Sequence, residues 1–495
     1  MLKILNTSQI KALDDYTIKH EPIASIDLME RACHAFVSWF NLHFDSSKKV
    51  GVVCGTGNNG GDGLGVARLL KEWGFQVKVW IVRGSVPESA DFKINLQRLK
   101  AKAFDIKAEI DQELFTGQDI LIDAIFGSGL SRPPEGIYAY TIRHINQSKA
   151  IRVAIDIPSG FMVDKPSDGE IVHANHTVSF QLPKLSFLFP KSEAFVGAWH
   201  IVNIGLNESF IRQTESNYFL LEQTDIKTML HERNKFSHKG NFGHALLIAG
   251  SYGKMGAAVL SARAAMRSGL GLLTVHVPKR CYEIIQTSVP EAMASVDASD
   301  EWFSSIPAIS NYSSIGVGPG IGQENQTVQA LKELLKSFNK PVVLDADALN
   351  IIGANKELQE YIPKGSILTP HPREFERIVG SWSNDFERLK KQLELSKKTN
   401  CIVLLKGANT SISTPEGKVY FNNTGNPGMA TGGSGDVLTG LVTGLLAQGY
   451  TSEESAILGV WIHGLAGDRA AIEGQETLIA SDIIDHLPEA FALCR

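Results

Sequence analysis

Hydrophobic and polar positions alternate along the chain in two successive series of the same kind. Apolar runs of strand length are followed by segments with apolar residues at i, i+3 and i+4, the period of an amphipathic helix. The first 46 residues show the helical period alone, at 8–20 and 23–44. Strands that alternate with helices form parallel sheets with helices on both faces. The pattern therefore predicts an α/β protein with two tandem three-layer α/β/α domains.

The first series ends near residue 206, and a mixed polar segment, 207–225, separates it from the second. The first series predicts strands at 49–55, 76–84, 119–127, 150–158 and 176–182. The second predicts strands at 244–251, 271–278, 313–320, 340–349, 365–371 and 401–410, a hairpin at 410–423, and helices at 434–449, 451–472 and 480–494. The chain has 495 residues, which suits two large domains. We expect them at 1–210 and 225–495.

Composition and charge exclude several classes of protein. The net charge is −5, so no positive field attracts nucleic acid or an anionic membrane. The chain has five cysteines and no C-x-x-C pair, which argues against a disulfide framework or zinc cluster and fits a reducing cytosol. We find no signal peptide and no apolar run of about 18 residues. We therefore expect a cytoplasmic protein that binds neither nucleic acid nor membrane.

The loop CGTGNNGGDGLG (54–65) follows the first strand and matches G-x-G-x-x-G. Glycines there let the first N–H groups of the next helix face a phosphate. The motif alone fits a redox cofactor or another nucleotide. Two details disfavour the redox site: Asn58, Asn59 and Asp62 add polar groups, and the second strand ends at Arg83, where an acidic residue would hold a ribose. Arg83 is either a surface residue or a contact for a 2′-phosphate.

Two acidic residues, Asp123 and Asp156, follow further strands of the first series. Ligands of open α/β sheets bind at the carboxyl ends of strands, and a buried carboxylate is costly unless it is paired. Either residue alone can cap a helix or tie a loop. Together with the glycine loop they indicate a site that holds a cation and performs acid–base chemistry.

The motifs GNNGGDG, DAIFGSGL and DIPSG, in this order, resemble the NAD(P)H-hydrate epimerase family, also called the YjeF N-terminal domain. The resemblance implies a Rossmann-like fold and an acid/base, Asp156, that contacts the substrate and epimerises its hydrated nicotinamide carbon. It implies a potassium ion held by Asn59, Asp123 and Ser159. It implies further substrate contacts from Asn58, Asn59, Gly60, Gly61, Asp62, Gly127, Ser128, Gly129, Leu130, Ser131, Arg132, Pro133 and Tyr138. The run that contains Asp164 departs from the family pattern.

A second glycine-rich loop, NPGMATGGSGD (426–436), leads directly into a predicted helix. Amides at a helix N-terminus bind anions, and Asp436 at the end of the loop is placed to accept a proton from a substrate hydroxyl, as phosphoryl transfer requires. The alternative is a helix cap. No Walker A motif occurs, which argues against a P-loop fold. His371 and Glu374 mark either a helix start or part of the site, and Lys406 is either a solvated charge or a ligand contact.

The series GVGPGIG, DADALN, TPHPRE, KGANT and GNPGMATGGSGD resembles the ribokinase-like superfamily, and within it the ADP/ATP-dependent NAD(P)H-hydrate dehydratase family. The resemblance implies Asp436 as catalytic base and Mg²⁺ with ADP or ATP as co-substrate. It implies hydrate contacts from Ala258, Gly320, His371 and Asp436. It implies nucleotide contacts from Lys406, Gly407, Ala408, Asn409, Thr410, Asn426, Gly432, Gly433, Ser434 and Gly435. Arg373 stands where the family usually has glycine, which removes no reacting group.

Together the two resemblances imply repair of hydrated NADH and NADPH: epimerisation of the R and S forms, then dehydration of the S form with ADP, giving AMP and phosphate. They also imply a homo-oligomer, a tetramer or larger. One alternative is a ribokinase-like vitamin or sugar kinase with a regulatory nucleotide-binding first domain. Another is a first domain that binds without catalysis, against which Asp123 and Asp156 argue.

Overall fold

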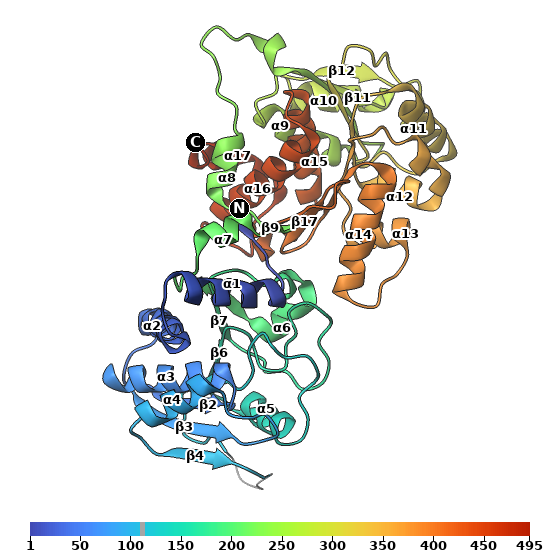
Figure 1. Ribbon diagram of the computed structural model, residues 1–495. Helices are drawn as coiled ribbons and strands as arrows, with labels where there is room; N and C mark the ends of the chain where they lie inside the picture. The colour runs from blue at the N-terminus through green and yellow to red at the C-terminus, as the bar shows by residue number, and fades with distance from the viewer. Residues whose placement is uncertain (109–113) are drawn as a thin grey trace. The chain divides into compact units, whose positions relative to one another are not determined.

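The computed structural model describes residues 1–108 and 114–495, which divide into two compact units. Leu2–Ser216 form the first unit, and Asn217–Arg495 together with Met1 form the second. Each unit has a largely parallel sheet between layers of helices (Figure 1), which confirms the predicted α/β class. No helix in the described part of the chain combines the length and the hydropathy needed to cross a bilayer.

The sheet of the first unit is entirely parallel, in the order β4-β3-β2-β5-β6-β7-β8. The strands of this unit are β1 (Leu2–Lys3), β2 (Lys49–Cys54), β3 (Gln76–Val82), β4 (Ala103–Ile106), β5 (Ile120–Ala124), β6 (Ile151–Ile155), β7 (His176–Phe180) and β8 (Ala198–Val202). Its helices are α1 (Thr7–His20), α2 (Ser25–His43), α3 (Asn58–Glu72), α4 (Ala90–Arg98), α5 (Ile137–Gln147), α6 (Glu193–Val196) and α7 (Glu208–Gln213).

Apolar residues of the first sheet are buried on both faces. On one face, α2 and α3 insert fully buried side chains such as Phe36 and Leu64 against β2, β3 and β5. On the other, Ile142 and Tyr138 of α5 pack against Trp80 and Leu121. Burial on both faces explains why these strands are continuous apolar runs in the sequence. The strand order reverses between β2 and β5, and such a reversal opens a crevice at the carboxyl ends of the two strands.

The sheet of the second unit runs β9-β18-β17-β16-β15-β14-β13-β10-β11-β12. Its strands are β9 (Tyr218–Leu220), β10 (His244–Ile248), β11 (Leu272–Val277), β12 (Met293–Val296), β13 (Ser314–Val317), β14 (Val342–Leu344), β15 (Ile367–Leu368), β16 (Ile402–Leu405), β17 (Thr410–Ser413) and β18 (Val419–Asn422). Its helices are α8 (Gln223–Met229), α9 (Met255–Arg267), α10 (Tyr282–Ser288), α11 (Asn325–Ser337), α12 (Ala346–Ala354), α13 (Pro372–Val379), α14 (Asp385–Thr399), α15 (Ser434–Ala447), α16 (Ser452–Ala470) and α17 (Ala480–Leu493).

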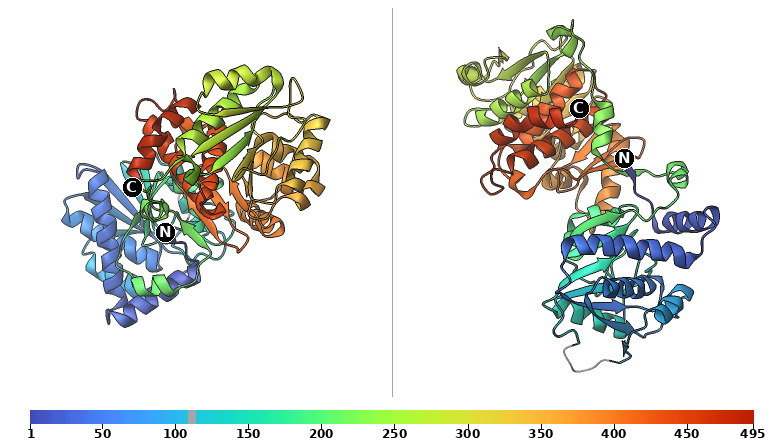
Figure 2. Two further views of the ribbon diagram at one scale, coloured as in Figure 1. Left: turned by 90° about the horizontal axis from the view of Figure 1, so that it is seen from above. Right: turned by 90° about the vertical axis from the view of Figure 1, so that its left-hand side faces the viewer.

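The second unit is also three-layered. Strands β10 to β16 are parallel, and the β17–β18 hairpin adds an antiparallel pair. Helices α15, α16 and α17 cover one face of the sheet, and α11 to α14 cover the other (Figure 2, left). The order reverses between β10 and β13, and open α/β sheets bind their ligands at the carboxyl ends of strands at such a reversal.

Each strand predicted from the hydrophobic pattern is present, and so are the hairpin and the three closing helices. The pattern does not predict β4, β8, β9 and β12, because only Ile106 and Leu220 among their residues are buried. The segment 207–225 is more than a polar junction: it contains α7 and β9, and β9 pairs with β18. Short, half-exposed strands lack the apolar runs that reveal the central ones.

Helix α15 lies directly against α9, and this contact generates a stability prediction. A Cβ atom added at Gly440 would lie 1.9 Å from the backbone oxygen of Ser261, whereas one added at Gly256 would meet nothing within 4 Å. We expect Gly440→Ala to lower the free energy of unfolding of the second unit by about 1–3 kcal/mol, because two helix backbones must separate. Gly256→Ala should cost nothing. Scanning calorimetry of the full chain measures both, and equal Tm values would contradict the prediction.

Candidate functional sites

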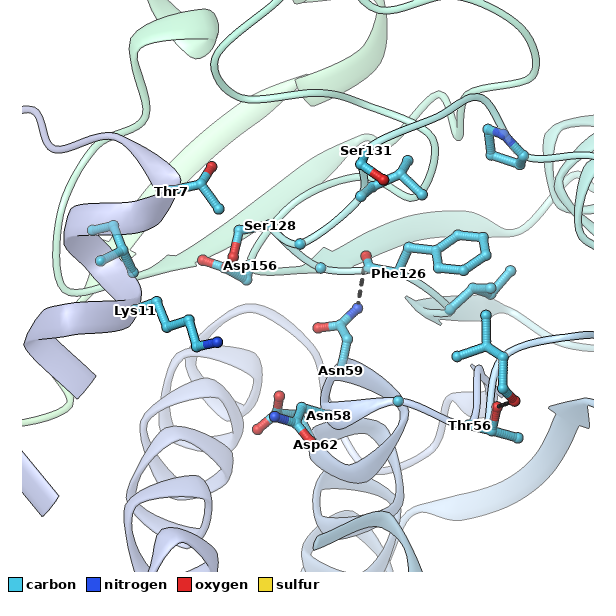
Figure 3. Close-up of a pocket in the computed structure, with 18 of the residues that line it drawn as sticks. Thr7, Lys11, Thr56, Asn58, Asn59, Asp62, Phe126, Ser128, Ser131 and Asp156 are labelled. Carbon is cyan, nitrogen blue, oxygen red and sulfur yellow. Dashed lines mark hydrogen bonds between the residues drawn. The ribbon is translucent and has the colours of Figure 1, made fainter. Parts of the chain in front are cut away.

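The first unit has a cavity of about 670 Å³ at the carboxyl ends of its strands (Figure 3). Its walls are α1, the start of α3, the loop after β5, and residues that follow β6 and β7. The cavity lies at the strand-order reversal between β2 and β5, where an open α/β sheet binds its ligand.

The loop after β2 makes two backbone contacts that only glycine allows. A Cβ atom at Gly60 would lie 1.9 Å from the oxygen of Gly55, and one at Gly55 would lie 2.1 Å from the oxygen of Ile125. Gly57 caps α3, so the helix begins directly at Asn58, beside the cavity. The first N–H groups of a helix have no partner within it and attract anions. The start of α3 can therefore hold a phosphate.

Asn59, Asp123 and Ser159, the residues expected to hold a cation, lie together around Phe126. The Asn59 amide donates to the Phe126 oxygen at 2.9 Å, and the Phe126 N–H donates to Ser159 Oγ at 2.8 Å. The Ser159 hydroxyl and N–H donate to the two Asp123 oxygens at 2.6 and 2.7 Å. Burial raises the pKa of Asp123 to about 6 even though these donors lower it.

The groups around Phe126 that could act as ligands of a cation all offer oxygen atoms: a carboxylate, a hydroxyl, an amide and a backbone carbonyl. Hard cations bind oxygen ligands, and carbonyl oxygens replace the hydration shell of potassium. The described residues include no cluster of three or more His, Cys, Asp or Glu suited to a metal ion. This set of oxygen atoms suits a hard cation better than a transition metal, which favours nitrogen and sulfur ligands.

Asp156 is held rigidly by one of its two oxygens. Its Oδ1 accepts from Ser179 Oγ at 3.1 Å, from the Phe180 N–H at 3.1 Å, and lies 3.2 Å from Lys184 Nζ. Its φ of 61° is unusual outside glycine and is typical of strained functional residues. No donor to Oδ2 is found among the described residues, and Asp156 lines the cavity. One oxygen therefore anchors the carboxylate while the other is available to a ligand.

Lys184 was not anticipated from the sequence. Its side chain is 2% exposed, and Nζ donates to the backbone oxygens of Phe180 and Leu182 as well as facing Asp156. A buried lysine of this kind fixes the position of its carboxylate partner through a charge-assisted contact. The only signal in the sequence is a lysine within the apolar run LPKLSFLF.

Other expected residues of the first unit border the same cavity. The stretch Gly127–Pro133 lines it, and so does Tyr138, whose hydroxyl accepts from the Val86 N–H at 3.2 Å. Asp164 instead accepts from the Thr7 N–H at 2.8 Å and so fixes the start of α1. Arg83 is paired with Glu88 at 2.5 Å and Asp105 at 2.8 Å, and it is not among the cavity residues, which supports the surface interpretation.

In the second unit, Asp436 lies in the first turn of α15, after Gly433, which caps the helix with a φ of 94°. Burial raises the pKa of Asp436 to about 6; Asp345 raises it further, and Lys406 opposes them. His463 ties the loop to α16, with Nε2 3.0 Å from the Ser434 oxygen. An anion-binding helix start and a carboxyl group that titrates near neutrality therefore meet in one turn.

Lys406, after β16, forms an ion pair with Asp345, after β14. The distance from Nζ to Oδ1 is 2.9 Å, and Thr439 donates to the other Asp345 oxygen at 2.6 Å. Burial lowers the pKa of Lys406, but Asp345 and then Glu374 outweigh it and the pKa is raised. Lys406 is thus not the solvated charge that a lone lysine at a strand end suggests. Asp345 lies in the DADALN motif, but its role as the partner of Lys406 was not predicted.

His371 caps α13, as the helix-start interpretation predicts. Its Nδ1 accepts from the N–H groups of Arg373 and Glu374, and Glu374 accepts from the His371 N–H at 2.8 Å. Nε2 then carries the proton and faces Glu374 Oε1 at 3.2 Å. Burial and then Lys406 lower the pKa of His371, while burial raises that of Glu374 to about 6. The charge of Lys406 therefore acts on both residues of the helix cap, His371 and Glu374.

Ala258 and Gly320 lie at the reversal between β10 and β13. Ala258 is fully buried in α9, and a Cβ atom at Gly320 would lie 3.1 Å from the Lys254 oxygen at the start of the same helix. The Ser251 hydroxyl donates to the Gly320 oxygen at 2.7 Å. Gly320 thus lies against the start of α9, the helix that contains Ala258.

The residues expected to hold the nucleotide form two turns. In the first, Gly407 to Thr410, the Thr410 hydroxyl closes the turn onto the Gly407 oxygen at 2.9 Å; Ala408 and Asn409 lie between them. In the second, Asn426 donates to Asp468 at 3.0 Å and accepts from the Gly428 N–H. The remaining members, Gly432, Gly433, Ser434 and Gly435, lead into and begin α15. A Cβ atom at Gly435 would lie 3.3 Å from Lys406 Nζ, so the second turn leads back to the ion pair.

Two family models match the chain, one in each unit. The model of the YjeF-related protein N-terminus matches residues 25–186, and that of NAD(P)H-hydrate dehydratase matches residues 245–489. A crystal structure of the ADP/ATP-dependent NAD(P)H-hydrate dehydratase from Bacillus subtilis, co-crystallised with ATP and Mg²⁺, is 32% identical with a TM-score of 0.50. It covers 56% of this chain and 99% of its own.

Full-length relatives carry both parts. The bifunctional NAD(P)H-hydrate repair enzyme Nnr of Moorella thermoacetica is 34% identical, over 98% of this chain and 96% of its own. The enzyme of the same name from Coxiella burnetii is 35% identical, over 98% of this chain and 99% of its own. These matches favour the repair enzyme over the vitamin or sugar kinase. This chain belongs to the family of bifunctional NAD(P)H-hydrate repair enzymes.

Proposed function

We propose that the two units perform successive steps of one repair. The first unit, assigned to 1–210, interconverts the R and S forms of hydrated NADH and NADPH. The second, assigned to 225–495, dehydrates the S form with ADP and restores the reduced nicotinamide. The observation that carries this proposal is that each unit places one carboxylate, Asp156 or Asp436, beside a helix start that can hold a phosphate.

In the first unit, the start of α3 holds the phosphates of the substrate, and Asp156 Oδ2 faces the hydrated ring. The R and S forms differ at the carbon that bears the added hydroxyl. Asp156 acts as the acid/base that moves a proton while this hydroxyl leaves and returns. Asn59, Asp123 and Ser159 would hold a potassium ion, whose charge would stabilise bound phosphate.

In the second unit, Asp436 accepts the proton of the substrate hydroxyl as that oxygen attacks the terminal phosphate of the nucleotide. The hydroxyl becomes a phosphate ester. The C–O bond of this ester then breaks, phosphate leaves, and the neighbouring carbon loses a proton. Lys406 and the turns at 407–410 and 426–435 orient the nucleotide. Mg²⁺ would accompany it and neutralise phosphate charge. His371, Ala258 and Gly320 contact the hydrate.

The choice of ADP as donor and assembly as a tetramer or larger are part of the same proposal and rest on the family resemblance. The relative from Bacillus subtilis, named as ADP/ATP-dependent, keeps ATP as the other candidate. Incubation of the full chain with mixed NADH hydrates and either nucleotide tests the function: NADH absorbance returns, with release of free phosphate. A stable phosphorylated hydrate without NADH recovery would contradict it.

Asp156→Asn should leave R-hydrate unrepaired while S-hydrate is still repaired, because an amide neither gives nor takes the proton. We expect epimerisation to fall at least about 100-fold. Chromatographic separation of the two hydrates measures this directly. Asp168→Asn, an exposed carboxylate nearby in sequence, is the control and should behave as the wild type. Normal consumption of R-hydrate by Asp156→Asn would refute the assignment.

Asp436→Asn should abolish nucleotide-dependent recovery of NADH and leave epimerisation intact. The reason is loss of the base at the end of the anion loop, and a loss of about 100-fold or more is expected. Asp485→Asn changes a half-exposed carboxylate of α17 and serves as control. Recovery of NADH near the wild-type rate in the Asp436 variant would show that another group takes the proton.

The pKa of Asp436 predicts the pH dependence of dehydration. Since this pKa is about 6, the carboxyl group is protonated at lower pH and cannot act as a base. The rate of dehydration should therefore fall below about pH 6 and level off above pH 7. Glu374 has a similar pKa, so Glu374→Gln tests the assignment: its profile should keep the acid limb. Loss of the limb in Glu374→Gln would assign the titration to Glu374 instead.

A further inference from the structure

Four carboxyl groups line the cavity of the first unit: Asp14 from α1, Asp62 from α3, Glu135 just before α5, and Asp156 after β6. They differ in exposure and in their protein partners. Glu135 is exposed to solvent. Asp156 has three donors on one oxygen, including Lys184. The carboxyl groups of Asp14 and Asp62 are less exposed than that of Glu135, and they have no hydrogen bond or ion pair within the described residues.

Asp62 and Asp156 come from different walls of this cavity. Figure 3 shows the Asp62 side chain rising from α3 toward the space below Asp156, with Lys11 of α1 extending in from the side. The backbone oxygen of Asp62, in contrast to its side chain, has a partner: it accepts from the Cys33 thiol at 3.4 Å. The carboxyl group is thus free to meet a ligand opposite Asp156.

An enclosed carboxyl group without a donor is more stable neutral than charged. Burial raises the pKa of Asp62 well above its usual range, and Asp156, Asp14 and Asp91 raise it further. The protonated form of Asp62 is therefore favoured more than that of an exposed aspartate. The titratable groups that act on it or face the same cavity, from all packed elements, are Lys11, Asp14, Cys33, Cys54, Asp91, Arg132, Glu135, Tyr138, Asp156 and Lys184.

We propose that Asp62 is a second catalytic residue of the first unit, the acid that protonates the hydroxyl of the hydrate as it leaves. This rests on the proposed epimerisation. The proton of Asp62 passes to the departing oxygen, which leaves as water while the ring nitrogen lone pair forms a C=N bond. Water then adds to the other face of the same carbon and gives its proton to Asp156, and the return of that proton to Asp62 restores both groups for the next turnover. Two carboxyl groups in unlike environments, one bound by donors and one without them, are the usual arrangement for acid and base.

This role differs from the one that the family resemblance implies for Asp62, a contact to substrate phosphate or ribose. A binding contact affects KM, whereas an acid that acts at the reacting carbon affects kcat. An acid also sets a basic limb in the pH profile, because the rate falls once it is deprotonated. These two readouts separate the roles.

The test follows conversion of R-hydrate to S-hydrate by the full chain without nucleotide. Asp62→Asn keeps the size and a donor but cannot give a proton, so kcat should fall at least about 100-fold with KM changed by less than about threefold. The basic limb should disappear from the remaining activity. Asp62→Glu keeps the acid and should retain part of kcat and the limb. A raised KM with near-normal kcat in Asp62→Asn would overturn the proposal.

Asp168→Asn, which changes an exposed carboxylate outside the cavity lining, is the control, and its kcat should stay within a few-fold of the wild type. Asp14→Asn tests the other partly buried carboxyl group that lacks a donor: if Asp14→Asn loses kcat and the basic limb while Asp62→Asn keeps both, the proposal is wrong. Dehydration of S-hydrate and the Tm of each variant report folding. If the wild-type chain does not interconvert the hydrates, the proposed function itself fails, and the role of Asp62 with it.

Discussion

Close approach of backbone to backbone at the strand-order reversals is the constraint on which both sites depend. In the first unit, Gly60 lies against the Gly55 oxygen, and Gly55 against the Ile125 oxygen, so the loop after β2, the start of α3 and the loop after β5 form one rigid corner. In the second, Gly318, with a φ of 136°, lies where a Cβ atom would be 1.9 Å from the Asp345 oxygen. Any side chain here would push apart the elements that bring Asn59 to Phe126 and Asp345 to Lys406.

This constraint explains why the glycine-rich stretches were informative in the sequence. Strands β2, β5, β6, β10, β11 and β13 to β16 were predictable because burial on both faces makes them continuous apolar runs, and parallel strands deliver their carboxyl ends to one edge. The positions of Asp156 and Asp436 followed from that rule together with the family motifs. The edge strands β4 and β12 were not predictable, since almost all of their side chains are at least partly exposed and their sequences lack a continuous apolar run.

The hydrogen-bond and ion-pair partners of the acidic residues were the part of the sites that the sequence did not reveal. Asp123 and Asp156 both end strands, yet Asp123 is saturated by Ser159 whereas Asp156 keeps one oxygen without a described donor. Lys184 reaches Asp156 across 28 residues of sequence, and Lys406 reaches Asp345 across 61. Such pairs depend on sheet order and loop geometry, which a hydrophobic pattern does not encode. The sequence likewise does not show that the Asp62 carboxyl group lacks a hydrogen-bond donor, because this depends on the positions of its neighbours in the structure.

The two sites use charge in opposite ways to obtain a carboxyl group suited to acid–base work. At Asp436, burial and Asp345 raise the pKa while Lys406 lowers it, so the group remains available as a base near neutrality. Removing Lys406 would favour the neutral acid and leave Asp345 buried without its cation, which is costly. In the first unit, Lys184 contacts Asp156 and two backbone oxygens, and neither Asp14 nor Asp62 has an ion-pair partner among the described residues. The placement of a single lysine therefore decides, at each of the two sites, which carboxyl group has a cation in direct contact.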